Sequence, residues 1–152
     1  EHEAYVIVFE YLGKMNVPKG MYGAKRLRFK LHHWDKIGIQ NKVKQMAHYE
    51  GIRFARINPR NTSKLAFDGS GEVKRSERKD IAVFSTGKQY HADLNASYNI
   101  AARYFIREIK KSMSETKWLS LATKVSPDLL RITICTLSSL ITLRKVHAKS
   151  MA

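Results

Sequence analysis

The sequence of 152 residues contains one cysteine, Cys135, and only 13 acidic residues against 28 Lys and Arg. A single cysteine cannot form an intrachain disulfide, and it cannot provide the paired thiolates of a cysteine-based zinc site. The longest apolar stretch, residues 128–143, is interrupted by Arg131 and is too short to span a membrane. These shortages exclude a disulfide scaffold, and they are compatible with a reducing cytosol.

The surplus of basic residues gives a formal charge of +15. A surplus of that size predicts a polyanionic partner, most simply nucleic acid. Proteins that bind anionic membranes usually concentrate their basic residues in one amphipathic helix or one cluster, whereas here they are spread over most of the chain. We therefore expect nucleic acid as the partner and no membrane. The length fits one domain, and 43% hydrophobic residues suffice for a core.

The first apolar run, Ala4 to Phe9, is rich in β-branched and aromatic residues and predicts a buried strand that ends at Glu10. A carboxylate at the end of such a strand often faces the ligand crevice of an α/β sheet. A solvated carboxylate is the simpler alternative. Residues 11–31 are rich in glycine, Lys and Arg, which predicts a loop that contacts phosphates and leads into a helix.

Apolar residues from Trp34 to Glu50 predict a helix packed on one side, with Gly51 at its C-terminal cap. The run Ile52–Ile57 alternates apolar and basic residues and predicts a strand with Arg53 and Arg56 on its other face. Residues 60–91 then predict two successive β-hairpins, with turns at 68–71 and 85–88 and an exposed charged loop at 74–80 between them.

Residues 91–109 predict one long helix with Asp93 at its N-terminal end. Four alanines, at 92, 96, 101 and 102, would let this helix approach a sheet closely. Asn95 and Asn99 lie one turn apart, and we interpret them with Asp93 as a candidate metal and phosphate site. The alternative is that Asp93 only caps the helix, since acids are favoured in the first turn.

The C-terminal third is less distinctive. Residues 112–127 predict a polar connection with Trp118 and Leu119 as its candidate anchor, and residues 128–143 are predicted to form either an amphipathic helix or a strand. Residues 144–152 are expected to be disordered.

Three pieces of the chain, in this order, carry a family resemblance: Val8–Leu12, Asn58–Ser63 and Ala92–Ala102. With them the chain resembles the C-terminal part of TnpB, the OrfB protein of bacterial and archaeal insertion sequences. TnpB proteins are transposase-associated, RuvC-like, RNA-guided DNA endonucleases. The resemblance runs from about Tyr5 to about Glu108, and its last piece is the most specific.

The resemblance implies an α/β chain with a partial RNase H-like (RuvC) fold and an inserted, cysteine-less ribbon of two β-hairpins. Residues 1–59 would form a RuvC-like part, 60–91 a degenerate zinc ribbon, 92–111 a RuvC-like helix and 112–152 a C-terminal tail. Glu10 and Asp93 would be the second and third catalytic carboxylates, and both would be ligands of Mg²⁺ or Mn²⁺. Such sites hydrolyse phosphodiesters with two divalent ions, for which hard carboxylate oxygens are suitable ligands.

Two departures from the family pattern matter. The first catalytic Asp of the family lies upstream of Glu1, and the chain starts without Met, so we expect an excised or truncated piece that is catalytically incomplete on its own. The cysteine pairs of the family's zinc ribbon are missing, so we expect no zinc ligands. The ribbon is then expected to be held by apolar contacts among Leu65, Phe67, Val73, Val83, Phe84 and Tyr90.

The expected partners are DNA, a guide RNA and the upstream part of the same protein, in the prokaryotic cytoplasm with the nucleoid. The residues predicted to contact nucleic acid are Lys14, Lys19, Lys25, Arg26, Arg28, Lys30, Arg53, Arg56, Arg60, Asn95 and Asn99. The alternative function is non-enzymatic: a truncated or nuclease-dead relative that only holds nucleic acid. A third hypothesis is that the apolar residues 129–143 pair with another chain.

Overall fold

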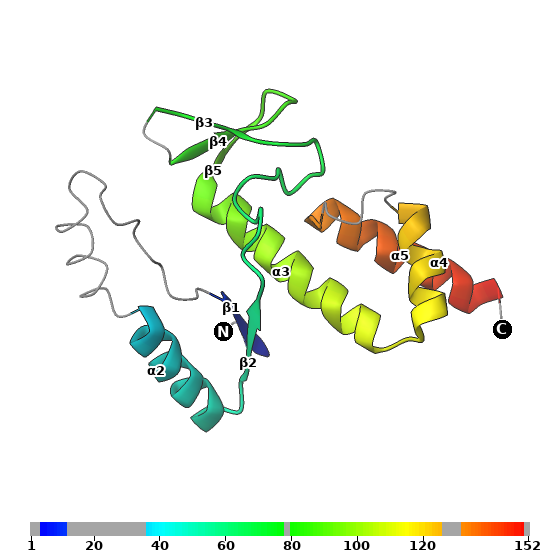
Figure 1. Cartoon of the computed structure of the whole chain (residues 1–152), viewed down its shortest axis with the longest axis horizontal. Helices are drawn as coiled ribbons and strands as arrows, with labels where there is room; N and C mark the ends of the chain where they lie inside the picture. Colours follow the sequence, from blue (N-terminus) through cyan, green and yellow to red (C-terminus); the bar gives the residue numbers. More distant parts are fainter. Residues whose placement is uncertain (1–3, 12–35, 78–79, 126–131, 151–152) are drawn as a thin grey trace, which may run out of the picture. The chain divides into compact units, whose positions relative to one another are not determined.

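The computed structural model describes residues 4–11, 36–77, 80–125 and 132–150. The chain divides into two compact units, Glu1–Pro59 and Arg60–Ala152. Helices and small sheets occur in the described residues, so the α/β class is confirmed, whereas the RNase H-like fold stays a prediction (Figure 1).

In its described residues, 4–11 and 36–59, the first unit contains a parallel pair of strands and one helix. Strand β1 (Val6–Glu10) pairs with β2 (Arg53–Ile57) in parallel, so that Glu10 lies opposite Ile57 at the carboxyl end of both strands. The predicted helix is α2 (Lys36–Tyr49), which lies in the connection between the two strands. All three elements are confirmed, although β1 is half-buried along its whole length and not buried as expected.

The end of α2 follows the prediction for Gly51. Its φ of 68° is in the left-handed region, which glycine adopts without the steric cost of a Cβ. The Gly51 N–H donates to the carbonyl of His48, and the Ile52 N–H donates to that of Ala47. These bonds pair the last carbonyls of the helix and turn the chain directly into β2.

The prediction for the two arginines of β2 is wrong. Side chains alternate between the faces of a strand, so residues three apart cannot share a face. Arg53 lies on the same face of the strand as the buried Ala55 and Ile57, but at the exposed start of the strand. Arg56 lies on the opposite face, with Phe54, and its guanidinium is 5.5 Å from the centre of the Phe54 ring.

The second unit begins with the ribbon, residues 60–91. Its first hairpin is closed by an isolated bridge between Leu65 and Glu72 and by the bond from the Ala66 N–H to the Gly71 carbonyl, 2.9 Å long. Strands β3 (Lys74–Arg75), β4 (Ile81–Val83) and β5 (Gln89–His91) form an antiparallel sheet in that order. Both hairpins are confirmed, but Lys74 and Arg75, expected in a loop, form a strand.

The ribbon core is smaller than expected, because alanines supply most of it. Its buried members are Ala66, Ala82, Phe84 and Ala92, and Phe67, Val73 and Tyr90 pack against them. Of the six residues predicted to hold the hairpins, Phe67, Val73, Phe84 and Tyr90 belong to this cluster. Leu65 is buried outside it, and Val83 is only half-buried.

Three helices complete the second unit: α3 (Ala92–Lys111), α4 (Glu115–Val125) and α5 (Ile134–Ser150). The predicted long helix is confirmed as α3. The prediction of a connection over 112–127 is wrong, since α4 forms there. Residues 144–150, expected to be disordered, continue α5.

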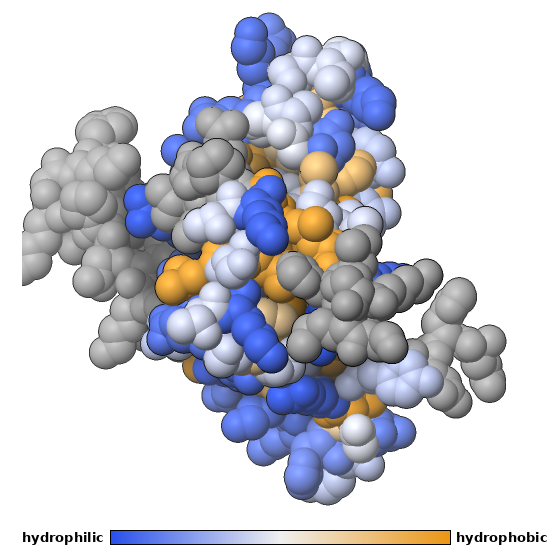
Figure 2. All heavy atoms as spheres, turned by 90° about the vertical axis from the view of Figure 1, so that its right-hand side faces the viewer, coloured by the Kyte–Doolittle hydropathy of each residue, from blue (hydrophilic) through white to orange (hydrophobic). Residues whose placement is uncertain are grey.

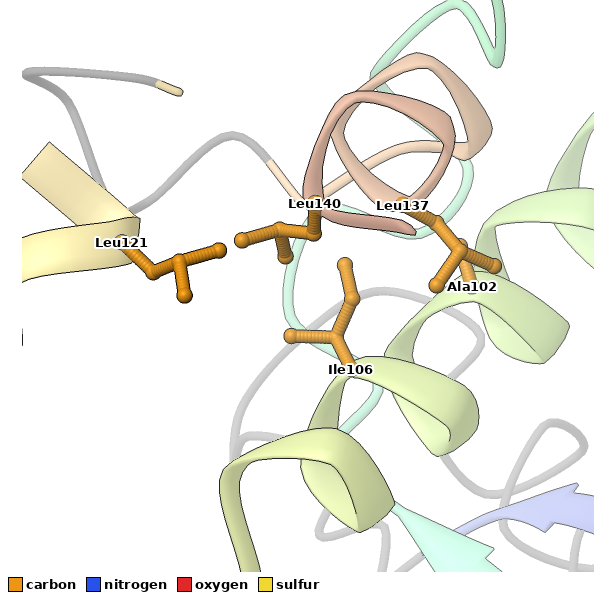
Figure 3. Packing of buried hydrophobic residues seen from close by; sticks show 5 residues of the cluster. All are labelled: Ala102, Ile106, Leu121, Leu137 and Leu140. Carbon is orange, nitrogen blue, oxygen red and sulfur yellow. The ribbon is translucent and has the colours of Figure 1, made fainter. Parts of the chain in front are cut away.

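The core of the helical part joins all three helices. Ala102 and Ile106 from α3, Leu121 from α4, and Leu137 and Leu140 from α5 point toward one another (Figure 3). The half-buried Trp118 packs against this cluster, whereas Leu119 is 48% exposed and is not the expected anchor. Much of the apolar tail therefore pairs with α3 of its own chain, which removes the main reason to expect another chain there. In the described part of the chain, no helix is long and apolar enough to cross a membrane.

Candidate functional site

Glu10 is held at the carboxyl end of β1 by its backbone. Its carbonyl accepts a hydrogen bond of 3.1 Å from Nε2 of Gln40, a residue of α2 that is only 6% exposed. The next N–H, that of Tyr11, donates to the carbonyl of Ile57 at 2.7 Å. These two bonds fix the backbone on either side of the Glu10–Tyr11 peptide. The half-buried Glu10 side chain lies at the edge where ligands approach parallel sheets.

Asp93 lies in the first turn of α3 and is exposed. The residue that caps the helix is His91, whose extended backbone precedes the first turn and whose Nδ1 accepts a 3.3 Å hydrogen bond from the Asp93 N–H. In neutral His91 this bond leaves the ring proton on Nε2. The carboxylate lies in the first turn of a 20-residue helix, where acidic side chains stabilise helices.

Replacing His91 by Ala is expected to lower the free energy of unfolding by about 1 kcal/mol, because one orphan N–H of α3 loses its acceptor. His91→Ser should restore most of that stability, since a serine hydroxyl also caps helices well. Urea denaturation of the three proteins measures both effects. A serine variant as unstable as the alanine variant would show that the cap is not what His91 contributes.

The two acids belong to different units: Glu10 to the first, Asp93 to the second. Each offers a carboxylate that a hard divalent cation accepts, and neither is deeply buried. Among the residues that the structure describes, no three His, Cys, Asp or Glu side chains gather in a way that could hold a metal ion. Each carboxylate by itself therefore has the donor chemistry of a Mg²⁺ ligand, and their pairing in one site stays a prediction.

Asn95 and Asn99 do not belong to that site. Both side chains are fully buried, and both bond to the backbone of the ribbon segment 62–67. Asn95 donates to the Leu65 carbonyl at 2.9 Å and accepts from the Phe67 N–H at 2.9 Å. Asn99 donates to the carbonyls of Thr62, at 3.0 Å, and Leu65, at 2.8 Å.

The prediction that these amides contact nucleic acid beside Asp93 is therefore wrong. Positions 93 and 95 are two residues apart on a helix and cannot face the same way. The buried face of α3 carries Asn95 and Asn99, while Asp93 is exposed. We call the two side chains the asparagine clamp, because they pin the start of the ribbon to α3.

Six of the cations predicted to contact nucleic acid lie outside the described residues: Lys14, Lys19, Lys25, Arg26, Arg28 and Lys30. Arg53 and Arg60 are exposed. Arg56 is half-buried, and its Nη2 donates to Oδ1 of Asn41 at 3.4 Å. Part of the Arg56 guanidinium is thus engaged within the first unit.

In addition to the predicted Arg60, the ribbon carries three basic residues that were not singled out from the sequence: Lys64, Lys74 and Arg75. The Val73 N–H donates to the Lys64 carbonyl at 2.8 Å, and Nη2 of Arg75 donates to the Ser63 carbonyl at 3.1 Å, so the segments 63–64 and 73–75 lie side by side. Arg60, Lys64, Lys74 and Arg75 are all exposed, and we call them the ribbon basic surface. Hydrophilic side chains dominate the ribbon at the top of Figure 2. Extending the two strands of the first predicted hairpin farther from its turn would have placed residues 63–64 opposite 73–75. That longer pairing could have revealed this group from the sequence.

Residues 38–100 match the family model described as Cas12f1-like, TNB domain. The matched segment holds most of α2, β2, the ribbon and the first half of α3, so it includes Asp93 and leaves Glu10 outside. No curated protein and no solved structure matches the chain. The match supports a relationship of this segment to TnpB-like and Cas12f-like proteins. The RuvC-like assignment and the metal site stay predictions.

Proposed function

We propose that this chain is the C-terminal portion of a TnpB-type, RNA-guided DNA endonuclease and that its nuclease site is completed by residues outside the sequence. The observation that carries the proposal is the Cas12f1-like match over 38–100, which includes the TnpB-like piece Asn58–Ser63 and most of the piece Ala92–Ala102. The local positions of Glu10, at a parallel strand end, and Asp93, at a helix N-terminus, are those of acids that face ligands.

In the proposed site Glu10 and Asp93 would hold divalent ions through their carboxylate oxygens. The bound ions would supply an activated water and stabilisation of the charge on the leaving oxygen. The chain's own part is orientation. Gln40 and the β1–β2 pairing hold the backbone of Glu10, and the His91 cap holds that of Asp93, so that neither acid has to be ordered when DNA binds.

The ribbon basic surface is the proposed contact with the phosphate backbone of DNA or RNA. Its cations are exposed, and three of them, Lys64, Lys74 and Arg75, lie on the neighbouring segments 63–64 and 73–75. Phosphate contacts release counterions, so binding through this surface should weaken steeply as salt is added. It would position the nucleic acid without reading its sequence, which suits a protein whose specificity comes from a guide.

The double variant Lys64→Gln, Lys74→Gln is expected to weaken binding of labelled single-stranded DNA and to reduce the slope of log K against log [salt] by about 1 to 2. Lys117→Gln with Lys124→Gln is the matched control, because it removes the same charge from exposed positions on α4. Fluorescence anisotropy at several salt concentrations measures both slopes. Equal slopes for the two double variants would argue against the ribbon as the contact.

The proposed nuclease is tested by titrating Mg²⁺ or Mn²⁺ into the purified chain, alone and joined to its upstream segment, with labelled single-stranded DNA as substrate. Cleavage only by the joined form is the expected result. Binding without cleavage in either form would contradict the nuclease and favour the non-enzymatic alternative. Absence of both binding and cleavage would contradict both functions.

A further inference from the structure

The ribbon is too small to explain its own stability. It spans residues 60–91, and it supplies only Ala66, Ala82 and Phe84 to the buried part of its core, which is completed by Ala92 of α3. Units of fewer than about 40 residues usually need a metal, a disulfide or a partner to fold. The sequence has one cysteine and so provides neither a disulfide nor a thiolate zinc site. Some other element has to hold the ribbon.

One side of the ribbon is held by the asparagine clamp of α3. The first turn, at 67–71, receives a separate contact from the start of α5. The Cys135 N–H, in the first turn of α5, donates to the Phe67 carbonyl at 3.2 Å. A Cβ added at Gly69 would lie 3.0 Å from the Cβ of Cys135 and 3.2 Å from its Sγ. The turn and the helix are therefore in direct contact at these two residues.

The N-terminus of α5 is itself prepared for this contact. Thr133 is 3% exposed and exchanges hydrogen bonds with Thr136: each backbone N–H donates to the other's Oγ1, at 3.3 and 3.4 Å. This reciprocal cap fixes the first turn of α5. Farther along, Leu137 and Leu140 anchor α5 to α3. The start of α5 is thus held on both sides of Cys135, by the threonine cap and by the leucine contacts with α3.

We infer that α5 serves the ribbon as an intramolecular clamp, docked on the 67–69 turn, in place of the cysteine-bound metal that a ribbon without cysteine cannot hold. The contact is concentrated at Phe67, Gly69 and Cys135, because beside it the ribbon and the helices leave a cavity of about 220 Å³ lined in part by Thr136 and Ser139. The C-terminal helices are then part of the folding unit of the ribbon. The stability of its first turn depends on the docking of α5.

Two glycines of the ribbon provide a matched test in the full chain. Gly69 and Gly87 both lie in hairpin turns, with φ of 83° and 81°, so an alanine carries the same backbone strain at either position. Only at Gly69 does the added Cβ meet α5, since nothing lies within 4 Å of it at Gly87. The difference between the two alanine variants therefore measures the contact with α5.

Amide hydrogen exchange of the Cys135 N–H is the readout, because this N–H donates to the Phe67 carbonyl across the contact. Gly69→Ala is expected to lower its protection about tenfold, while Gly87→Ala leaves it unchanged. Equal losses of protection in the two variants would overturn the inference that α5 holds the ribbon turn.

If Gly69→Ala does not fold, hydrogen exchange of the unsubstituted chain in rising urea is the test. The amides of Ala66, Gly69 and Cys135 should then open together, and separate opening of Cys135 would overturn the inference. DNA binding has no part in either measurement, so failure of the proposed function leaves this result intact.

Discussion

Asp93→Asn and Glu10→Gln are each expected to abolish Mg²⁺-dependent cleavage by the complete nuclease while leaving nucleic-acid binding nearly unchanged. Each change replaces a charged metal ligand by a neutral amide of the same shape. The metal ions of such a site contribute several kcal/mol of transition-state stabilisation, which corresponds to a loss of about 10³-fold or more in rate. Cleavage of labelled target DNA and its binding are measured side by side.

Matched controls separate metal binding from helix capping. Glu115→Gln removes an exposed acid from the first turn of α4, the same place that Asp93 holds on α3. Glu50→Gln removes an exposed acid from the first unit. Both controls should cleave at the normal rate. Cleavage retained in both Asp93→Asn and Glu10→Gln would contradict the assignment of the two acids as catalytic metal ligands, whatever the outcome for the controls.

Asn95→Ala is expected to reduce the free energy of unfolding by about 2 to 5 kcal/mol, the largest stability effect that we foresee. The substitution leaves the Phe67 N–H without its acceptor and takes one of two donors from the Leu65 carbonyl. It also opens a cavity at a fully buried position. Each buried group left unpaired costs about 1 to 3 kcal/mol, and the cavity adds to that.

Ser97→Ala is the control on the same helix. Ser97 is exposed and bonds only to the Leu94 carbonyl of its own turn, so its loss should change stability by no more than about 0.5 kcal/mol. Urea unfolding followed by circular dichroism compares the variants. If Asn95→Ala instead keeps full stability and loses DNA affinity, the side chain contacts nucleic acid, and the asparagine clamp is not its role.

The local elements of this chain were predictable from its residues because their signals are local. Alternation and β-branching predict β1 and β2, the pair Asp68-Gly69, typical of tight turns, predicts the first ribbon turn at 68–71, and Gly51 predicts the end of α2. The charge of +15 predicts a polyanionic partner without any knowledge of the fold. The acids Glu10 and Asp93 were singled out because strand ends and helix starts can be recognised in one dimension.

Tertiary structure decided which polar side chains serve the surface and which serve the core. Asn95 and Asn99 look like surface amides until the segment 62–67 is seen to place backbone groups against them. Residues 115–125 and 134–150 form helices because apolar side chains there pack against α3, and no local pattern encodes those contacts. Pairing between distant segments also brought the ribbon cations together and seated α5 on Gly69. Such contacts depend on residues that are far apart along the chain, and their energies exist only once the chain has folded.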